Sequence, residues 1–410
     1  MRRLNNQDSL VCVPARSRDR LLSRGHLFIV ADGMGAHAAG ELASRMAVDQ
    51  IAQHYAKLSE NSGQPEAIAE AIRRTNNDIH SRGQNNPEFH NMGTTASVLV
   101  LSPGGATIGH VGDSRVYRLR GGELQQWTFD HSLVWELQAG GQLNADNIGR
   151  IPKNVITRSL GPNAEVQVDI EGPIDVKVGD RFLLCSDGLT GNVTDEEIAI
   201  LLDSLSEQTA TQVLIDLANL RGGPDNISVI VVDVVGDLGG GSHPKGSFAP
   251  RRPVPPMLWA TAALCLIAGL MLLVLQMPGP AMVAMALGVV TLAIAMSIWM
   301  SPPAPAGASN AAASGSAGGG QGPYRSYRTP NRANMVRSLS ETVTALREAA
   351  GTQGWDIDWG SIDESQSKSE AAMQAGQWQV AVRHQAEAVT GTMRQLREQN
   401  NRAASETAIE

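Results

Sequence analysis

The chain has 410 residues, of which 42% are hydrophobic and 18% charged, and its formal net charge is −8. This length is sufficient for more than one domain. Three scattered cysteines exclude a disulfide framework and fit a reducing compartment. Residues 1–237 carry 20 Lys and Arg against 30 Asp and Glu, whereas residues 238–410 carry 13 against 11. The acidic first part argues against nucleic acid as a partner, since that would require basic patches.

Apolar runs at 28–31, 106–111 and 181–185 predict largely buried strands, and each run leads into an aspartate that we expect in a turn. Carboxylates in such places are costly unless a cation meets them. An all-oxygen donor set suits Mg²⁺ or Mn²⁺ rather than Zn²⁺. One Asp-Gly pair alone indicates only a turn, but five aspartates together favour a metal site. They are Asp8, Asp32, Asp113, Asp187 and Asp225.

Six segments of the first 235 residues carry a more specific signal. They are 3–8 (RLNNQD), 30–35 (VADGMG), 93–95 (GTT), 109–115 (GHVGDSR), 184–189 (LCSDGL) and 223–229 (GPDNISV). In this order they resemble the motifs of the metal-dependent protein phosphatases of type 2C, in their bacterial form. The resemblance covers about residues 1–235. It implies an α+β fold, an α/β/β/α sandwich of two antiparallel sheets flanked by helices.

The resemblance also implies a metal centre of two, or with a weaker site three, Mn²⁺ or Mg²⁺ ions. Asp32 would bridge two ions, and the carbonyl of Gly33 would complete one of them. Asp187 and Asp225 would hold the other ion. Asp113, sharing Asp187, would serve the third site that bacterial members have.

The implied reaction is the hydrolysis of phosphoserine and phosphothreonine in proteins. Asp8 would act through metal-bound water, and Arg3 would clamp the substrate phosphate. Two ions roughly 3.5–4 Å apart lower the pKa of a bridging water, which then attacks phosphorus in line. The expected partners are phosphoproteins, including substrates of a cognate Ser/Thr kinase.

Several positions depart from the family pattern. Gln7 stands where many members have Glu, which predicts weaker metal binding, and Met34 stands where eukaryotic members have His. Arg3 is only the third residue, so the family's first strand has no room and should be missing, and we expect a misassigned start codon. These departures keep open a second class of function, a catalytically impaired, membrane-bound regulator that binds phosphoproteins.

A different phosphatase chemistry is suggested by Cys12 and Arg18, which have the Cys-x5-Arg spacing of cysteine phosphatases. The loop between them contains Pro14 and no glycine. The nest of N–H groups that a reactive thiolate needs is therefore not expected. The polar segment 142–154 matches the family's flap, where we expect substrate selection.

Beyond Val235 the composition changes. Residues 236–256 form a Gly/Pro-rich linker, and no charged residue occurs between Arg252 and Arg325. Runs 257–275 and 281–300 are each long enough for a ~30 Å hydrocarbon core, which predicts a transmembrane helical hairpin rather than a buried soluble one. Basic residues outside both ends of the hairpin place the phosphatase domain and the C-terminal tail in the cytoplasm, with the chain anchored in the bacterial inner membrane.

The last part of the chain begins with a flexible spacer, 301–334, rich in Pro, Ala, Gly and Ser. Residues 335–410 predict a helical tail, because Met335, Leu339, Val343 and Leu346 recur at helical spacing. Residues 371–396 resemble one helical hairpin of tetratricopeptide type, a unit that buries its apolar face poorly alone. A small interaction module and a plain solvated tail both remain open.

Overall fold

The computed structural model describes residues 5–35, 38–58, 63–142, 151–152, 155–239, 322–329 and 331–407, together with parts of 261–300. The chain divides into two compact units. One unit joins Met1–Gly241 to Ala317–Glu410, and the other is Ser242–Ser316. The first unit therefore contains both the five aspartates and the C-terminal helices.

The first sheet of this unit is antiparallel, with the order β1-β2-β4-β5-β8 and β3 paired to β2. Its strands are β1 (Asp8–Val13), β2 (His26–Met34), β3 (Gly93–Thr94), β4 (Ala96–Ser102), β5 (Gly105–Val111) and β8 (Asp169–Ile174). The predicted strands at 28–31 and 106–111 are confirmed within β2 and β5. Their alternate buried side chains face the helices and the second sheet.

The second sheet is also antiparallel and has the order β10-β9-β6-β7-β11. Its strands are β10 (Val229–Asp233), β9 (Arg181–Cys185), β6 (Arg115–Arg120), β7 (Glu123–Gln126) and β11 (Arg325–Arg328). The predicted strand 181–185 is confirmed as β9. β11 comes from the segment that the sequence assigns to the spacer, and it pairs with β7, with Arg325 opposite Gln126.

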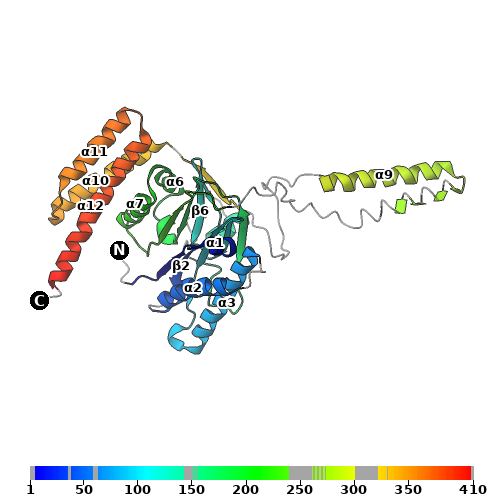
Figure 1. Cartoon of the computed structure of the whole chain (residues 1–410), viewed down its shortest axis with the longest axis horizontal. Helices are drawn as coiled ribbons and strands as arrows, with labels where there is room; N and C mark the ends of the chain where they lie inside the picture. Colours follow the sequence, from blue (N-terminus) through cyan, green and yellow to red (C-terminus); the bar gives the residue numbers. More distant parts are fainter. Residues whose placement is uncertain are drawn as a thin grey trace. The chain divides into compact units, whose positions relative to one another are not determined.

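The helices of the sandwich lie within residues 18–220, and several of them cover the two sheets (Figure 1). They are α1 (Arg18–Ser23), α2 (Ala38–Lys57), α3 (Gln64–Asn85), the short η1 (Pro87–Phe89), α4 (Leu133–Ala139), α5 (Asp187–Thr190), α6 (Asp195–Ser204) and α7 (Glu207–Leu220). α2 and α3 pack on the first sheet, and α6 and α7 on the second. Val30, Phe182, Leu184 and Ile230 are buried between the sheets. The predicted α/β/β/α sandwich is confirmed.

Three further helices follow β11 and lie side by side (Figure 1). They are α10 (Arg332–Gln353), α11 (Trp359–Gln374) and α12 (Trp378–Thr407). α12 packs on α10, α11, α7 and α6. Buried Leu339 and Val389 belong to the same hydrophobic core as Leu201 and Leu214 of α6 and α7. The C-terminal helices thus form an added layer over α6 and α7, rather than a solvated tail.

Two ion pairs connect this layer to α6 and α7 of the sandwich. Arg332 pairs with Asp203 of α6, and Nη1 of Arg397 lies 2.5 Å from Oδ1 of Asp216 in α7. The Asp216 side chain is 0% exposed. A buried carboxylate needs such a partner, so the Arg397 contact contributes to the docking of α12.

The predicted membrane hairpin is not found in the part of the chain that the structure describes. Run 281–300 falls within α9 (Pro278–Met300), and run 257–275 lies mostly outside the described residues. A membrane span needs about 20 apolar residues in one continuous helix. None of the helices described for this chain combines the necessary length and apolar character. The prediction of two spans in the inner membrane, with both ends in the cytoplasm, is therefore wrong.

Candidate metal centre

Two of the five aspartates are paired on neighbouring strands of the first sheet. Asp8 of β1 is directly opposite Asp32 of β2. β2 continues through Asp32 to Met34, so this Asp-Gly pair lies in extended strand and not in the turn that its sequence suggests. The N–H of Asp32 donates to Thr95 Oγ1 at 2.8 Å, and its carbonyl accepts from Thr94 Oγ1 at 2.9 Å. The backbone of Asp32 is thereby fixed.

Gly33 is enclosed by backbone on two sides. Its N–H donates to the carbonyl of Gln7 at 3.1 Å. A Cβ at this position would lie 2.1 Å from the carbonyl oxygen of Gly40 and 2.6 Å from that of Gln7. Only glycine fits between the N-terminal segment and α2, which explains why the sequence has Gly after Asp32.

Asp187 enters the same region from the second sheet. It is the first residue of α5, directly after β9. The preceding residue, Ser186, donates its hydroxyl to Asp8 Oδ2 at 2.7 Å and accepts from the N–H of Ser228 at 3.0 Å. Ser186 therefore connects Asp8 to the ends of β9 and β10.

Asn226 ties the loop of Asp225 to the start of the chain. Its Oδ1 accepts from the N–H of Gln7 at 2.9 Å, and its Nδ2 donates to the carbonyl of Asn5 at 3.2 Å. The Asn226 side chain is buried. The sequence motif pointed to Asp225, but Asn226 is the residue that anchors the segment carrying Gln7 and Asp8.

The aspartates perturb one another electrostatically. Burial, followed by the charges of Asp8, Asp187 and Asp113, raises the pKa of Asp32 well above its usual value. Burial and the charge of Asp187 raise the pKa of Asp113 to about 8. Burial also raises the pKa of Asp8, although hydrogen bonds from Ser186 and Ser228 oppose this change. Four of the five predicted aspartates, Asp8, Asp32, Asp113 and Asp187, are thus close enough to interact.

The residues present fit a divalent cation. Buried Asp8 Oδ1 and Asp113 Oδ1 accept no hydrogen bond from the residues that the structure describes. An ionised carboxylate oxygen in that position needs a cation. Among the described residues, no group of three or more Asp, Glu, His or Cys side chains is placed so that it could hold a metal ion. Hard ions such as Mg²⁺ keep several water ligands, so an open set of carboxylates is compatible with them.

Two stacked histidines hold the residue before Asp113. The rings of His110 and His131 are 5.0 Å apart. His110 Nε2 donates to the carbonyl of Gly112 at 2.9 Å, and the Gly112 N–H donates to His131 Nδ1 at 2.9 Å. Since Nδ1 of His131 accepts, its Nε2 carries the proton and donates to Asp169 at 2.9 Å. The sequence analysis missed this arrangement, for which no sequence signal stands out beyond the histidines themselves.

The cysteine phosphatase alternative does not fit the structure. Cys12 lies within β1 and not in a phosphate-binding loop, and burial raises the pKa of its thiol. A nucleophilic cysteine needs a lowered pKa. Of the other predicted residues, Arg3 and most of the flap, 142–154, lie outside the described residues.

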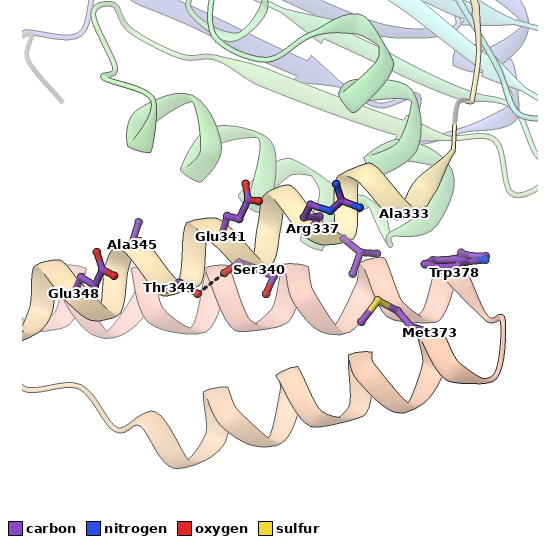
Figure 2. A pocket seen from close by; sticks show the side chains of 10 residues that line it. Ala333, Arg337, Ser340, Glu341, Thr344, Ala345, Glu348, Met373 and Trp378 are labelled. Carbon is purple, nitrogen blue, oxygen red and sulfur yellow. Dashed lines mark hydrogen bonds between the residues drawn. The ribbon is translucent and has the colours of Figure 1, made fainter.

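A separate cavity of about 580 Å³ lies in the C-terminal helices. Figure 2 shows Arg337 and Glu341 of α10 on one side, with Met373 and Trp378 on the other. None of the five aspartates lines it. The cavity is therefore distinct from the metal centre.

Comparison with known proteins identifies the fold and the family. The family model described as Protein phosphatase 2C matches residues 2–219. The chain is 39% identical over 210 residues to a putative protein phosphatase 2C-type of Streptococcus pyogenes, covering 50% of this chain and 85% of that protein. It is 37% identical over 237 residues to protein phosphatase PhpP of Streptococcus pneumoniae, covering 57% and 93%.

Solved structures of serine/threonine phosphatases resemble this chain in fold and sequence. The serine/threonine phosphatase PstP/Ppp of Mycobacterium tuberculosis is 34% identical with a TM-score of 0.51, covering 58% of this chain and 95% of that one. The serine/threonine phosphatase of S. agalactiae is 35% identical with a TM-score of 0.52, covering 58% and 96%. The chain therefore belongs to the protein phosphatase 2C family and is a protein-serine/threonine phosphatase.

Proposed function

We propose that this enzyme hydrolyses phosphoserine and phosphothreonine in proteins at the centre formed by the five aspartates. The observation that supports this most is the opposition of Asp8 and Asp32, together with the effect of Asp113 and Asp187 on the pKa of Asp32. Such a concentration of buried acid is costly without cations. Phosphoproteins made by a cognate Ser/Thr kinase are the proposed substrates, and removal of their phosphate is the proposed role in signalling.

In this proposal Asp32 and the Gly33 carbonyl would hold one Mn²⁺ or Mg²⁺ ion, and Asp32 would be shared with a second ion held by Asp187 and Asp225. When bound, two such ions supply an activated water and neutralise the phosphoryl oxygens. Asp8 would orient the attacking water, since the Ser186 hydroxyl donates to Asp8 Oδ2 at 2.7 Å and holds the carboxylate in place.

Two further residues have proposed roles. Asp113 belongs to a weaker third site, and the His110 and His131 clamp on Gly112 positions it. Arg3 clamps the substrate phosphate. The alternative of an impaired phosphoprotein-binding regulator is not favoured, because all five acids are present.

The full chain, freed of metal with a chelator, tests this function. It should release phosphate from a phosphothreonine peptide only after Mn²⁺ or Mg²⁺ is added. Asp32→Asn should lower kcat/KM at least about a hundredfold, since the shared ligand is weakened. The control is Asp49→Asn, an exposed acid of α2, which should be unchanged. Full activity in excess chelator would contradict the proposal, and phosphopeptide binding without turnover would support the regulator.

A further inference from the structure

The segment 322–328, called here the β11 segment, contacts the helix α4 although some 190 residues separate them in the chain. The guanidinium carbon of Arg325 lies 3.9 Å from the ring centroid of Trp135. Its Nη2 also donates to Gln138 Oε1 at 3.3 Å. Trp135 and Gln138 both belong to α4. A guanidinium over an indole is a favourable cation–π contact, so Arg325 holds α4 against the second sheet.

The β11 segment is also built into the sandwich at a buried carboxylate. The hydroxyl of Tyr324 donates to Glu171 Oε1 at 2.6 Å, and the N–H of Gly322 donates to Oε2 at 3.2 Å. Glu171 of β8 is only 3% exposed. The N–H of Tyr324 donates to the carbonyl of Gln126 at 2.9 Å. A buried carboxylate that receives two hydrogen bonds from this segment makes it an integral part of the catalytic unit.

Trp135 connects the β11 segment to the loop of Asp113. Phe129 lies edge-on to Trp135, with centroids 5.3 Å apart. Arg115 lies over the same indole at 5.6 Å. Arg115 also pairs with Asp130, Nη2 to Oδ2, at 2.7 Å. The Trp135 indole therefore contacts both Arg325 and Arg115, which is two residues after Asp113.

α4 also contacts residues 155–157, which follow the flap region in the chain. The N–H of Leu133 donates to the carbonyl of Val155 at 2.9 Å. The hydroxyl of Thr157 donates to Glu136 Oε1 at 2.6 Å. A shift of α4 would therefore move residues 155–157 as well as Trp135.

We infer that Arg325 is a positioning residue for the binding of phosphoprotein substrates, acting through Trp135 on α4. The inference rests on the proposed function. It assigns a part in substrate binding to the β11 segment, which lies outside the residues 2–219 that match the family model. The side-chain contacts described for Arg325 are with Trp135 and Gln138, and neither residue is one of the five aspartates. Its loss should therefore alter the binding of an extended peptide and leave the hydrolytic step intact.

The test compares two substrates on the full chain with Mn²⁺, a phosphothreonine peptide and p-nitrophenyl phosphate. Arg325→Ala should raise KM for the peptide about fivefold to tenfold, the size of one partly buried cation–π contact. Its kcat for the peptide, and both constants for p-nitrophenyl phosphate, should stay within about twofold. Arg325→Lys, which keeps a cation, should give an intermediate KM. Arg328→Ala is the matched control, because Arg328 is an exposed arginine of the same strand.

A double mutant separates positioning from a general loss of structure. In a Trp135→Leu background, Arg325→Ala should raise KM for the peptide no further, because the contact is already gone. Additive effects of the two substitutions would overturn the inference, as would equal losses on both substrates or an Arg325→Ala enzyme that matches Arg328→Ala. An unsubstituted chain that is inactive on both substrates would overturn the proposed function and the inference together.

Discussion

Asp8 and Asp32 form a directly opposed pair of carboxylates between β1 and β2. Like charges in such positions normally destabilise a sheet. Here the pair adjoins Asp187 and Asp113, and burial raises the pKa of Asp8, Asp32 and Asp113. The fold therefore keeps several mutually repelling carboxylates together in one buried place. Such clusters of groups with shifted pKa values are characteristic of functional sites.

Gly33→Ala should destabilise the enzyme and weaken its binding of Mn²⁺. The added Cβ would meet the backbone oxygens of Gly40 and Gln7 at 2.1 and 2.6 Å, so β1 or α2 must move. Gly391→Ala is the control, because no atom lies within 4 Å of its added Cβ and alanine favours a helix by about 0.5–1 kcal/mol. Urea unfolding and Mn²⁺ titration would measure both effects. Equal stability of the two variants would contradict the packing described for Gly33.

Leu339→Ala should lower the stability of the phosphatase part, although Leu339 belongs to α10. Its side chain is 0% exposed in the core shared with α6 and α7. Removal of such a side chain costs about 2–5 kcal/mol. Thermal unfolding should remain a single transition, and activity should be lost over the same temperature range. Leu22→Ala, at a position 56% exposed, should change little. Separate transitions for helix content and activity would show that the two parts unfold independently.

Arg397→Ala should destabilise the docking of α12 by about 1–3 kcal/mol, because it leaves the Asp216 carboxylate buried without its cation. Arg394→Ala removes an exposed arginine of the same helix and should have little effect. Urea unfolding monitored by circular dichroism would compare the two variants. If their midpoints coincide, the Arg397 contact contributes nothing to stability.

Asp169 should make stability fall at low pH. Burial opposes ionisation of Asp169, but hydrogen bonds from His131 and Arg158, with the charge of Arg158, lower its pKa from 3.8 to about 2. A lowered pKa in the folded state stabilises the protein above the unfolded value, and this stabilisation is lost as the pH falls from about 4 to 2. Asp169→Asn should therefore cost up to about 2 kcal/mol near neutral pH and almost nothing near pH 2. A cost independent of pH would contradict the ion pairing.

The sandwich was largely predictable from the sequence, and so was the proximity of Asp8, Asp113 and Asp187 to Asp32. Short, mostly apolar runs such as 106–111 and 181–185, each leading into a turn signal, predicted the buried strands. The Asp motifs between them are specific to one family, and the expected use of Mn²⁺ or Mg²⁺ is confirmed for that family. The extended backbone of Asp32 was not predictable, because Asp-Gly ordinarily indicates a turn. Only the pairing of β1 with β2 keeps this Asp-Gly pair in a strand.

The C-terminal part was less predictable. The four residues of β11 are too few and too polar to signal a strand, and their pairing with β7 depends on a contact distant in the chain. The helical spacing of Leu339 and Val343 indicated an apolar face but not its partner, α6. The membrane hairpin was inferred from hydropathy alone, whereas none of the helices that the structure describes is both long and apolar enough to cross a membrane.

The most direct test of the metal centre is a calorimetric titration of Mn²⁺ into the metal-free full chain, with hydrolysis of a phosphothreonine peptide followed in parallel. The unsubstituted chain should bind at least two ions and gain activity as they bind. Asp32→Asn should lose both the binding and the activity, whereas Asp113→Ala should lose only a weaker site and less activity. Unchanged Mn²⁺ binding in Asp32→Asn, or equal losses in the two variants, would contradict the assignment of Asp32 as the shared ligand.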